Sequence, residues 1–129
     1  MEFQTLLENR RSVRSYDASK TVTREQIKEI VEAGILAPSW KNSQTARYYC
    51  VIDEAAKEKF AKECLPEFNI NSSKGAGAYV ITTFVANRSG FDREGNPDNE
   101  CGNGWGYYDL GLHNENVILK AKELGLDTL

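Results

Sequence analysis

Ala78–Ala86 reads AYVITTFVA, a nearly continuous run of apolar and β-branched residues. Such a run is typical of a strand that is buried on both faces of a sheet. A second β-rich run, Arg47–Ile52, is bounded by Asp53 and predicts another strand. Residues 54–65 look helical and stop at Pro66, because proline cannot continue a helix. The centre of the chain therefore predicts a strand, a helix and a strand.

Further helices are predicted on both sides of this centre. Apolar residues at helical spacing indicate a short amphipathic helix over residues 2–10. Another helix begins at Thr23, whose hydroxyl can form a capping box with Gln26, and ends at Pro38. A long helix is predicted over residues 105–124, with a glycine directly after it as a stop.

The order of these elements indicates a layered domain. Helices flank each predicted strand, which favours an α/β or α+β arrangement in a single domain, residues 1–129. Two strands alone make a poor sheet for so many apolar residues. We therefore expect further strands to follow Leu129 in the parent protein.

The composition is that of an ordinary globular protein. Apolar residues make up 40% and charged residues 27%, and the net charge is −3. This acidic balance argues against a nucleic-acid partner and against attraction to an acidic membrane surface. The N-terminus is not a signal peptide and no apolar run is long enough to cross a membrane, so we expect a cytoplasmic protein. The three cysteines lack metal-ligand spacing, so no metal site is predicted, and buried free thiols are the expected outcome.

The first candidate for chemistry is Arg10-Arg11-Ser12-Val13-Arg14. Three guanidinium groups and a hydroxyl within five residues can form a fork around a phosphate dianion. The alternative is that cations near the end of a helix only complement its dipole. The spacing alone leaves both interpretations open.

Two polar segments are weaker candidates. Pro38–Gln44 reads PSWKNSQ, and its small hydroxyl and amide side chains can hydrogen-bond a planar heteroaromatic ring, although a plain turn is the simpler interpretation. Asn71–Lys74 reads NSSK and precedes the apolar strand, where an amide and an ammonium group can meet carbonyl oxygens or a negative charge. Most such segments are solvated loops.

The remaining polar features, which include Asp109 of the long helix, favour packing over chemistry. In the long helix, Gly111 allows another backbone to approach closely, and Asn116 needs a partner if it is buried. His113 is interpreted as a core or interface residue, because no cysteine or serine pairs with it at a recognisable spacing. We therefore predict no catalytic residue. The loop over residues 90–104 is long enough to suggest a functional or mobile segment.

These signals, in their order along the chain, resemble the nitroreductase-like flavoprotein family. The specific elements are Arg10-Arg11-Ser12-Val13-Arg14 and, after a helix, Pro38-Ser39 followed by Asn42-Ser43-Gln44. The resemblance covers essentially the whole chain, as the N-terminal two-thirds to three-quarters of a family member. It implies an α+β three-layer fold with a central mixed β-sheet flanked by helices, here without its C-terminal part.

The resemblance also implies a function. The protein would be an FMN-dependent oxidoreductase that passes hydride from NAD(P)H, through FMN, to an electron-poor acceptor such as a nitroaromatic or a quinone, in a ping-pong cycle. It would work as a homodimer with FMN at the subunit interface. The alternative is a non-catalytic flavin-binding or dimerisation protein that retains the fold. The positions that match the family's cofactor-binding residues are Arg10, Arg11, Ser12, Arg14, Pro38, Ser39, Asn42, Asn71 and Lys74.

Overall fold

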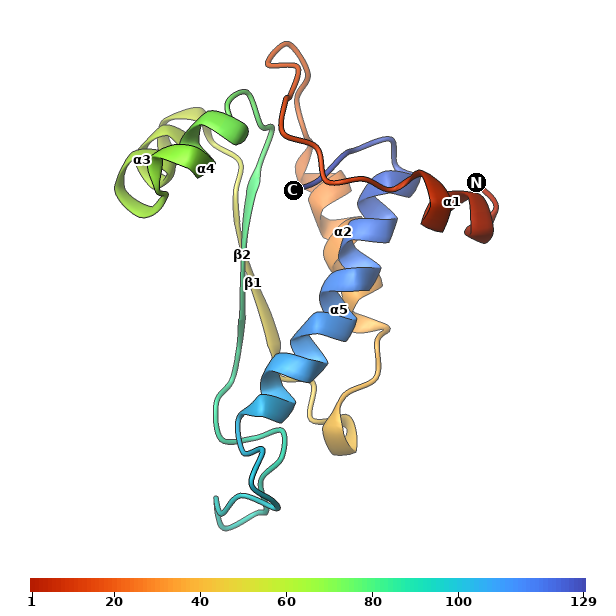
Figure 1. Ribbon diagram of the computed structural model, residues 1–129, viewed down its shortest axis with the longest axis vertical. Coiled ribbons are helices and arrows are strands. Elements are labelled where there is room, and N and C mark those ends of the chain that lie inside the picture. The colour runs from red at the N-terminus through yellow and green to blue at the C-terminus, as the bar shows by residue number, and fades with distance from the viewer.

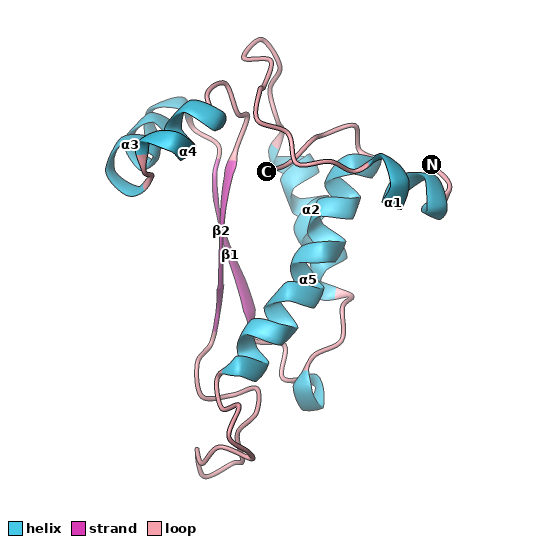
Figure 2. Ribbon diagram, viewed as in Figure 1, coloured by secondary structure: helices cyan, strands magenta, loops and turns pink.

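The computed structural model describes residues 1–129 as helices packed on a small sheet. A helix pair, α2 and α5, lies along one side of the strands, and α3 and α4 lie at one end on the other side (Figure 1). Loops connect these layers, and helices dominate the structure (Figure 2). The elements are α1 Phe3–Asn9, α2 Arg24–Ile35, the 3₁₀ helix η1 Trp40–Asn42, β1 Ala46–Val51, α3 Glu54–Cys64, α4 Glu67–Ser72, β2 Tyr79–Phe84 and α5 Gly104–Glu123.

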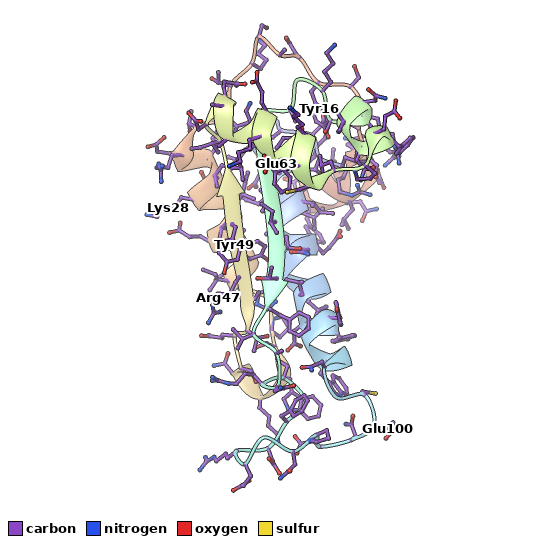
Figure 3. All side chains as sticks on the ribbon, turned by 90° about the vertical axis from the view of Figure 1, so that its left-hand side faces the viewer. Tyr16, Lys28, Arg47, Tyr49, Glu63 and Glu100 are labelled. Atoms are coloured by element: carbon purple, nitrogen blue, oxygen red, sulfur yellow. The ribbon has the colours of Figure 1, made fainter.

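The sheet is a single antiparallel pair. Ala46 is opposite Phe84 at one end, and Val51 is opposite Tyr79 at the other. The prediction that the second strand is buried on both faces is wrong, because every residue of β2 is only half-buried. The physical reason is that α3 and α4 cover only one end of the outer face. Figure 3 shows Arg47 and Tyr49 of β1 on this outer side.

The core lies between α2 and α5. Ile30 of α2 packs with Val117 and Ala121 of α5 in the main apolar cluster. Gly34 permits this close packing, since a Cβ at this position would lie 2.9 Å from Cγ2 of Val117. Asn116 donates a hydrogen bond to the Ala33 carbonyl at 3.2 Å, which confirms the packing role expected for it.

The ends of these helices follow the predicted signals. Thr23 accepts a hydrogen bond from the Gln26 N–H at 3.1 Å, and the Gln26 side chain accepts one from the Thr23 N–H at 3.0 Å. The capping box is therefore confirmed. At the end of α5, Gly125 has a φ of +78°. The next residue, Leu126, donates to the Ala121 carbonyl, which forms the glycine-terminated helix end known as a Schellman motif.

The expectations for the cysteines and for Gly111 are corrected, and the expected burial of His113 is confirmed. The cysteines Cys50, Cys64 and Cys101 are all exposed, because nothing in the chain covers β1 at Cys50, the end of α3 at Cys64 or the turn that holds Cys101. Gly111 has no atom within 4 Å of a Cβ built on it, so no other backbone of this chain approaches it. His113 is buried as expected, and its Nδ1 is 2.7 Å from the Asp109 carbonyl oxygen.

Candidate functional site

The arginine cluster, Arg10–Arg14, lies just beyond α1 in extended backbone. Arg10 is the C-cap residue of α1, so only one of the three arginines belongs to the helix end. Ser12 forms a parallel bridge with Thr128, and the Val13 N–H donates to the Thr128 carbonyl at 2.9 Å. The cluster is thereby fixed against the last residues of the described chain. An interpretation as helix-end decoration therefore does not account for Arg11 and Arg14.

The guanidinium groups of the arginine cluster have few protein partners. Arg11 donates from Nη1 to the Arg10 carbonyl at 2.7 Å. None of the three arginines forms an ion pair. Arg11 and Arg14 are exposed, and Arg10 is half-buried. Three positive charges therefore lie close in the chain without a neutralising carboxylate.

Tyr16 links the arginine cluster to the segment that carries Lys74. Its hydroxyl donates to the Val13 carbonyl at 2.9 Å. Its own carbonyl oxygen lies 3.0 Å from a Cβ built on Gly75, a residue with a φ of +83°. Burial raises the pKa of the Tyr16 hydroxyl, and the negative charge of Asp127 adds to this effect. The fold therefore brings the segment that follows Arg14 next to the segment that follows Lys74.

Asn71 and Lys74 are both exposed. The prediction that they lie on one loop is wrong for Asn71, which belongs to the six-residue helix α4. Pro66 supplies the N-cap of α4, so the proline that ends one helix also begins the next. Lys57 anchors the segment after α4, since its buried ammonium donates to the Ala76 carbonyl at 2.9 Å.

The second polar segment, Pro38–Gln44, forms a turn with an unusual backbone. Lys41, Asn42 and Gln44 have φ values of +46°, +54° and +50°. Such left-handed conformations are uncommon for residues other than glycine, and they persist only where the surroundings enforce them. Inside the turn, the Ser39 hydroxyl accepts a hydrogen bond from the Gln44 N–H at 2.9 Å.

A buried polar network holds this turn against α5. The Asp109 carboxylate accepts hydrogen bonds from the Trp40 N–H at 3.0 Å and from the Ser89 hydroxyl at 2.6 Å. The hydroxyls of Ser89 and Thr45 are 3.3 Å apart. Asp109, Ser89 and Thr45 are all almost fully buried. Sequence reasoning assigned a packing role to Asp109 but did not find the network, because its members are far apart in the chain.

Trp40 holds the same turn in place through its indole ring. Its ring lies against that of Trp105, with centroids 4.4 Å apart, and the Lys41 ammonium lies 5.5 Å from its centroid. The Trp40 Nε1–H is buried without a hydrogen-bond partner, whereas Trp105 donates to Asn99. The turn is therefore fixed by the packing of the two indole rings and by Asp109 together.

The candidate residues thus fall into two groups at opposite ends of the helix pair (Figure 1). The arginine cluster, Asn71 and Lys74 lie near the start of α2, and Pro38, Ser39 and Asn42 follow its end. The 12 residues of α2 span about 18 Å between these two ends. One copy of the chain therefore holds the two groups at different ends of α2.

No cluster of three or more histidine, cysteine or acidic side chains has a metal-binding arrangement. None of the helices has the length and hydropathy that crossing a bilayer requires.

The comparisons with known proteins bear on this arrangement. A model of the Nitroreductase family matches residues 7–83, which is more than half of the chain. The chain belongs to the Nitroreductase family. The matched range begins before the arginine cluster and ends within β2, so it includes every candidate residue named above.

Relatives of known sequence or structure support this family membership. "Putative NAD(P)H nitroreductase YdgI" of Bacillus subtilis (strain 168) is 35% identical over 84 residues, which are 65% of this chain and 39% of that protein. A Desulfovibrio desulfuricans protein solved in complex with FMN is 26% identical, with a TM-score of 0.69 over 94% of this chain and 62% of that one. A protein of Exiguobacterium sibiricum, also solved with FMN, is 22% identical, with a TM-score of 0.75 over 98% of this chain and 72% of that one.

These likenesses confirm the α+β nitroreductase fold. The chain spans less than half of the length of the Bacillus subtilis relative and about three-fifths of the Desulfovibrio desulfuricans protein. The two antiparallel strands and their flanking helices are thus a portion of a fold that is longer in these relatives.

Proposed function

We propose that this chain is part of an FMN-dependent oxidoreductase subunit that takes hydride from NAD(P)H and passes it to an electron-poor acceptor. Family membership and the FMN-bound state of two structural relatives support this proposal. The name of the Bacillus subtilis relative supports NAD(P)H as the donor. Nitroaromatics and quinones are the acceptor classes expected from the sequence. The cytoplasmic location and the single-domain organisation stay predictions.

The observation that carries the proposal is the set of unpaired cations at one end of the molecule. Arg10, Arg11 and Arg14 have no carboxylate partner, and Lys74 is exposed on the segment that packs against Tyr16. A phosphate dianion is the ligand that such guanidinium groups bind best, through charge-assisted hydrogen bonds. The three arginines, with the Ser12 hydroxyl, fit the phosphate and ribityl chain of FMN.

Hydride transfer between a nicotinamide and an electron-poor acceptor is the chemistry that FMN supplies when it is bound. The role proposed for Asn71 and Lys74 is to contact the N1/O2 side of the flavin. An ammonium group there stabilises negative charge on the ring. No side chain is required as a nucleophile, and the only histidine, His113, is buried and bonded within α5.

We further propose that the working unit is a homodimer. Pro38, Ser39 and Asn42 follow the end of α2, whereas the arginine cluster lies near its start. We assign them to the flavin that the partner copy holds, as the resemblance to the family implies. The exposed surface supports a homodimer. The chain exposes 8642 Å², whereas a compact monomer of its mass exposes about 6,900 Å². Large apolar side chains lie on this surface, including Phe3, Leu36, Phe68 and Tyr107.

The absorbance spectrum of the purified protein tests the function. A flavin spectrum after addition of FMN and gel filtration, bleached by NADH or NADPH without oxygen, is the expected result. A flavin spectrum that neither donor bleaches would instead indicate the non-catalytic flavin-binding protein. A protein that retains no flavin would contradict both.

A further inference from the structure

A cavity of about 640 Å³ lies beside the strained turn, at the end of the molecule away from the arginine cluster. Residues of the turn and of the loop after β2 line it, and only one of the lining residues is hydrophobic. The volume falls within the range of small-molecule sites, which is about 300–1,000 Å³. The lining residues that matter here are Lys41, Ser43, Asn87, Arg88, Phe91 and Arg93.

The cavity has an excess of free positive charge. Arg88 and Arg93 form no ion pair and no side-chain hydrogen bond. Lys41 is the one lining cation with a carboxylate partner, at 2.8 Å from Asp98. Two guanidinium groups on one cavity are therefore left without a protein partner.

The acidic lining residue, Asp92, forms no ion pair with either arginine. Asp92 accepts hydrogen bonds from the Asn96 N–H at 2.7 Å and from its side-chain amide at 3.1 Å. Both carboxylate oxygens thus bond within the loop, and the group keeps its negative charge beside a cavity that is also lined by three cations. The same hydrogen bonds lower the pKa of Asp92, so its charge serves to close the turn over residues 92–96.

The loop that carries the two arginines is held in place. Asn87 and Asn103 are joined by two hydrogen bonds, of 2.7 and 2.9 Å. The buried Ser89 hydroxyl donates a hydrogen bond to Asp109. Gly90 packs so closely on Trp105 that a Cβ built on it would lie 2.5 Å from the indole ring. A cavity wall that is fixed before the ligand arrives loses less entropy on binding.

We propose that this cavity binds a phosphate group of the nicotinamide dinucleotide donor, through Arg88 and Arg93. This proposal rests on the proposed function, which supplies the donor. The donor is the reactant that carries phosphate, whereas nitroaromatic and quinone acceptors need none. Planar guanidinium groups match phosphate oxygens in pairs, and the half-buried Phe91 ring offers an apolar surface to the adenosine part. The turn next to the cavity holds Asn42, which is proposed to face the flavin of the other subunit.

Binding without turnover tests the cavity independently of the flavin reaction. The probes are 2′,5′-ADP and 5′-ADP, and the signal is the fluorescence of Trp40 and Trp105 next to the cavity. We expect saturable binding of at least one probe, and a rise of about tenfold or more in its dissociation constant in Arg88→Ala/Arg93→Ala. Arg24→Ala, which removes an exposed guanidinium at the start of α2, is the matched control and should bind as the original protein does.

Steady-state kinetics then identify which phosphate group of the donor the cavity binds. If the cavity holds the 2′-phosphate, KM rises in the double variant for NADPH and stays unchanged for NADH. If it holds the pyrophosphate, KM rises for both donors. Equal binding of both probes by the double variant and the original protein would overturn the proposal, as would no binding to the original protein. If the protein binds a probe but neither NADH nor NADPH reduces its flavin, the proposed function is overturned and the cavity remains a phosphate site.

Discussion

The Asp109 carboxylate on α5 accepts a hydrogen bond from the backbone N–H of Trp40 at 3.0 Å, across 69 positions of the chain. The same oxygen accepts the Ser89 hydroxyl, so one buried oxygen fixes both the strained turn and the loop after β2. These two segments form the walls of the cavity and carry the second group of candidate residues. Asp109 therefore positions this end of the molecule although it faces no ligand site itself.

Asp109→Ala is expected to destabilise the protein. Removing the carboxylate leaves the Trp40 N–H without its acceptor, at a cost of about 1–3 kcal/mol, and leaves the Ser89 hydroxyl with only the Thr45 hydroxyl, 3.3 Å away. Asp109→Asn should recover most of this loss, because an amide oxygen can accept the same hydrogen bonds. Urea denaturation measures the effect.

Glu115→Ala is the matched control for Asp109→Ala, since Glu115 is exposed on the same helix. It should change the free energy of unfolding by less than about 0.5 kcal/mol. Equal midpoints for Asp109→Ala and Glu115→Ala would mean that the network contributes nothing to stability.

Local signals in the sequence predicted most of the elements. The capping box at Thr23, the prolines and Gly125 mark helix ends through the hydrogen bonds of the first and last turns, which depend on nearby residues only. Both strands were placed within one or two residues of their positions. The helix α4 was missed, because its asparagine and serine residues are more typical of caps and turns.

The candidate site was predictable only in part. The order of motifs identified the family, but no local pattern indicates that Thr45, Ser89 and Asp109 meet, since these contacts join distant positions. The left-handed backbone at Lys41 and Gln44 also escaped prediction, because neither residue type favours it. Exposure of the cysteines depends on which faces the rest of the fold covers. The local sequence pattern around a cysteine does not contain this information.

Two glycines of α5 should respond in opposite ways to alanine. A Cβ on Gly106 would lie 2.3 Å from the Phe84 ring, so Gly106→Ala forces the ring or the helix to move. Overpacking of this kind costs about 1–3 kcal/mol. Gly111 has open space around it, and Gly111→Ala should stabilise the helix by roughly 0.5–1 kcal/mol. Thermal unfolding compares the two, and a Gly111→Ala protein less stable than the original would contradict the open space at this position.

Alkaline pH should weaken the contact between Tyr16 and the arginine cluster. Burial and the charge of Asp127 raise the pKa of Tyr16 above the usual tyrosine value of about 10. A group with a raised folded-state pKa contributes stability that is complete below the unfolded pKa and is lost as the pH rises through the folded pKa. Tyr16→Phe removes this contribution.

Urea midpoints at about pH 9 and pH 11, on either side of the unfolded tyrosine pKa, measure the effect. The midpoint of the original protein should fall more steeply with pH than that of Tyr16→Phe. Tyr48 supplies a reference, because its pKa is also raised by burial and it is present in both proteins. Parallel pH profiles would show that Tyr16 ionises as freely in the folded protein as in the unfolded one.

Arg10→Ala/Arg14→Ala is expected to abolish retention of FMN while leaving the helix content intact. Each guanidinium that binds the phosphate contributes about 1.5–3 kcal/mol, so the double change should raise the dissociation constant at least roughly 100-fold. The fold should survive, because neither side chain forms an ion pair and the backbone N–H of Arg10, not its side chain, caps α1. Flavin absorbance after gel filtration and circular dichroism measure the two effects, and Arg24→Ala is again the matched control. Unchanged flavin occupancy in the double variant would mean that the arginine cluster does not hold the phosphate, even though the chain has the nitroreductase fold.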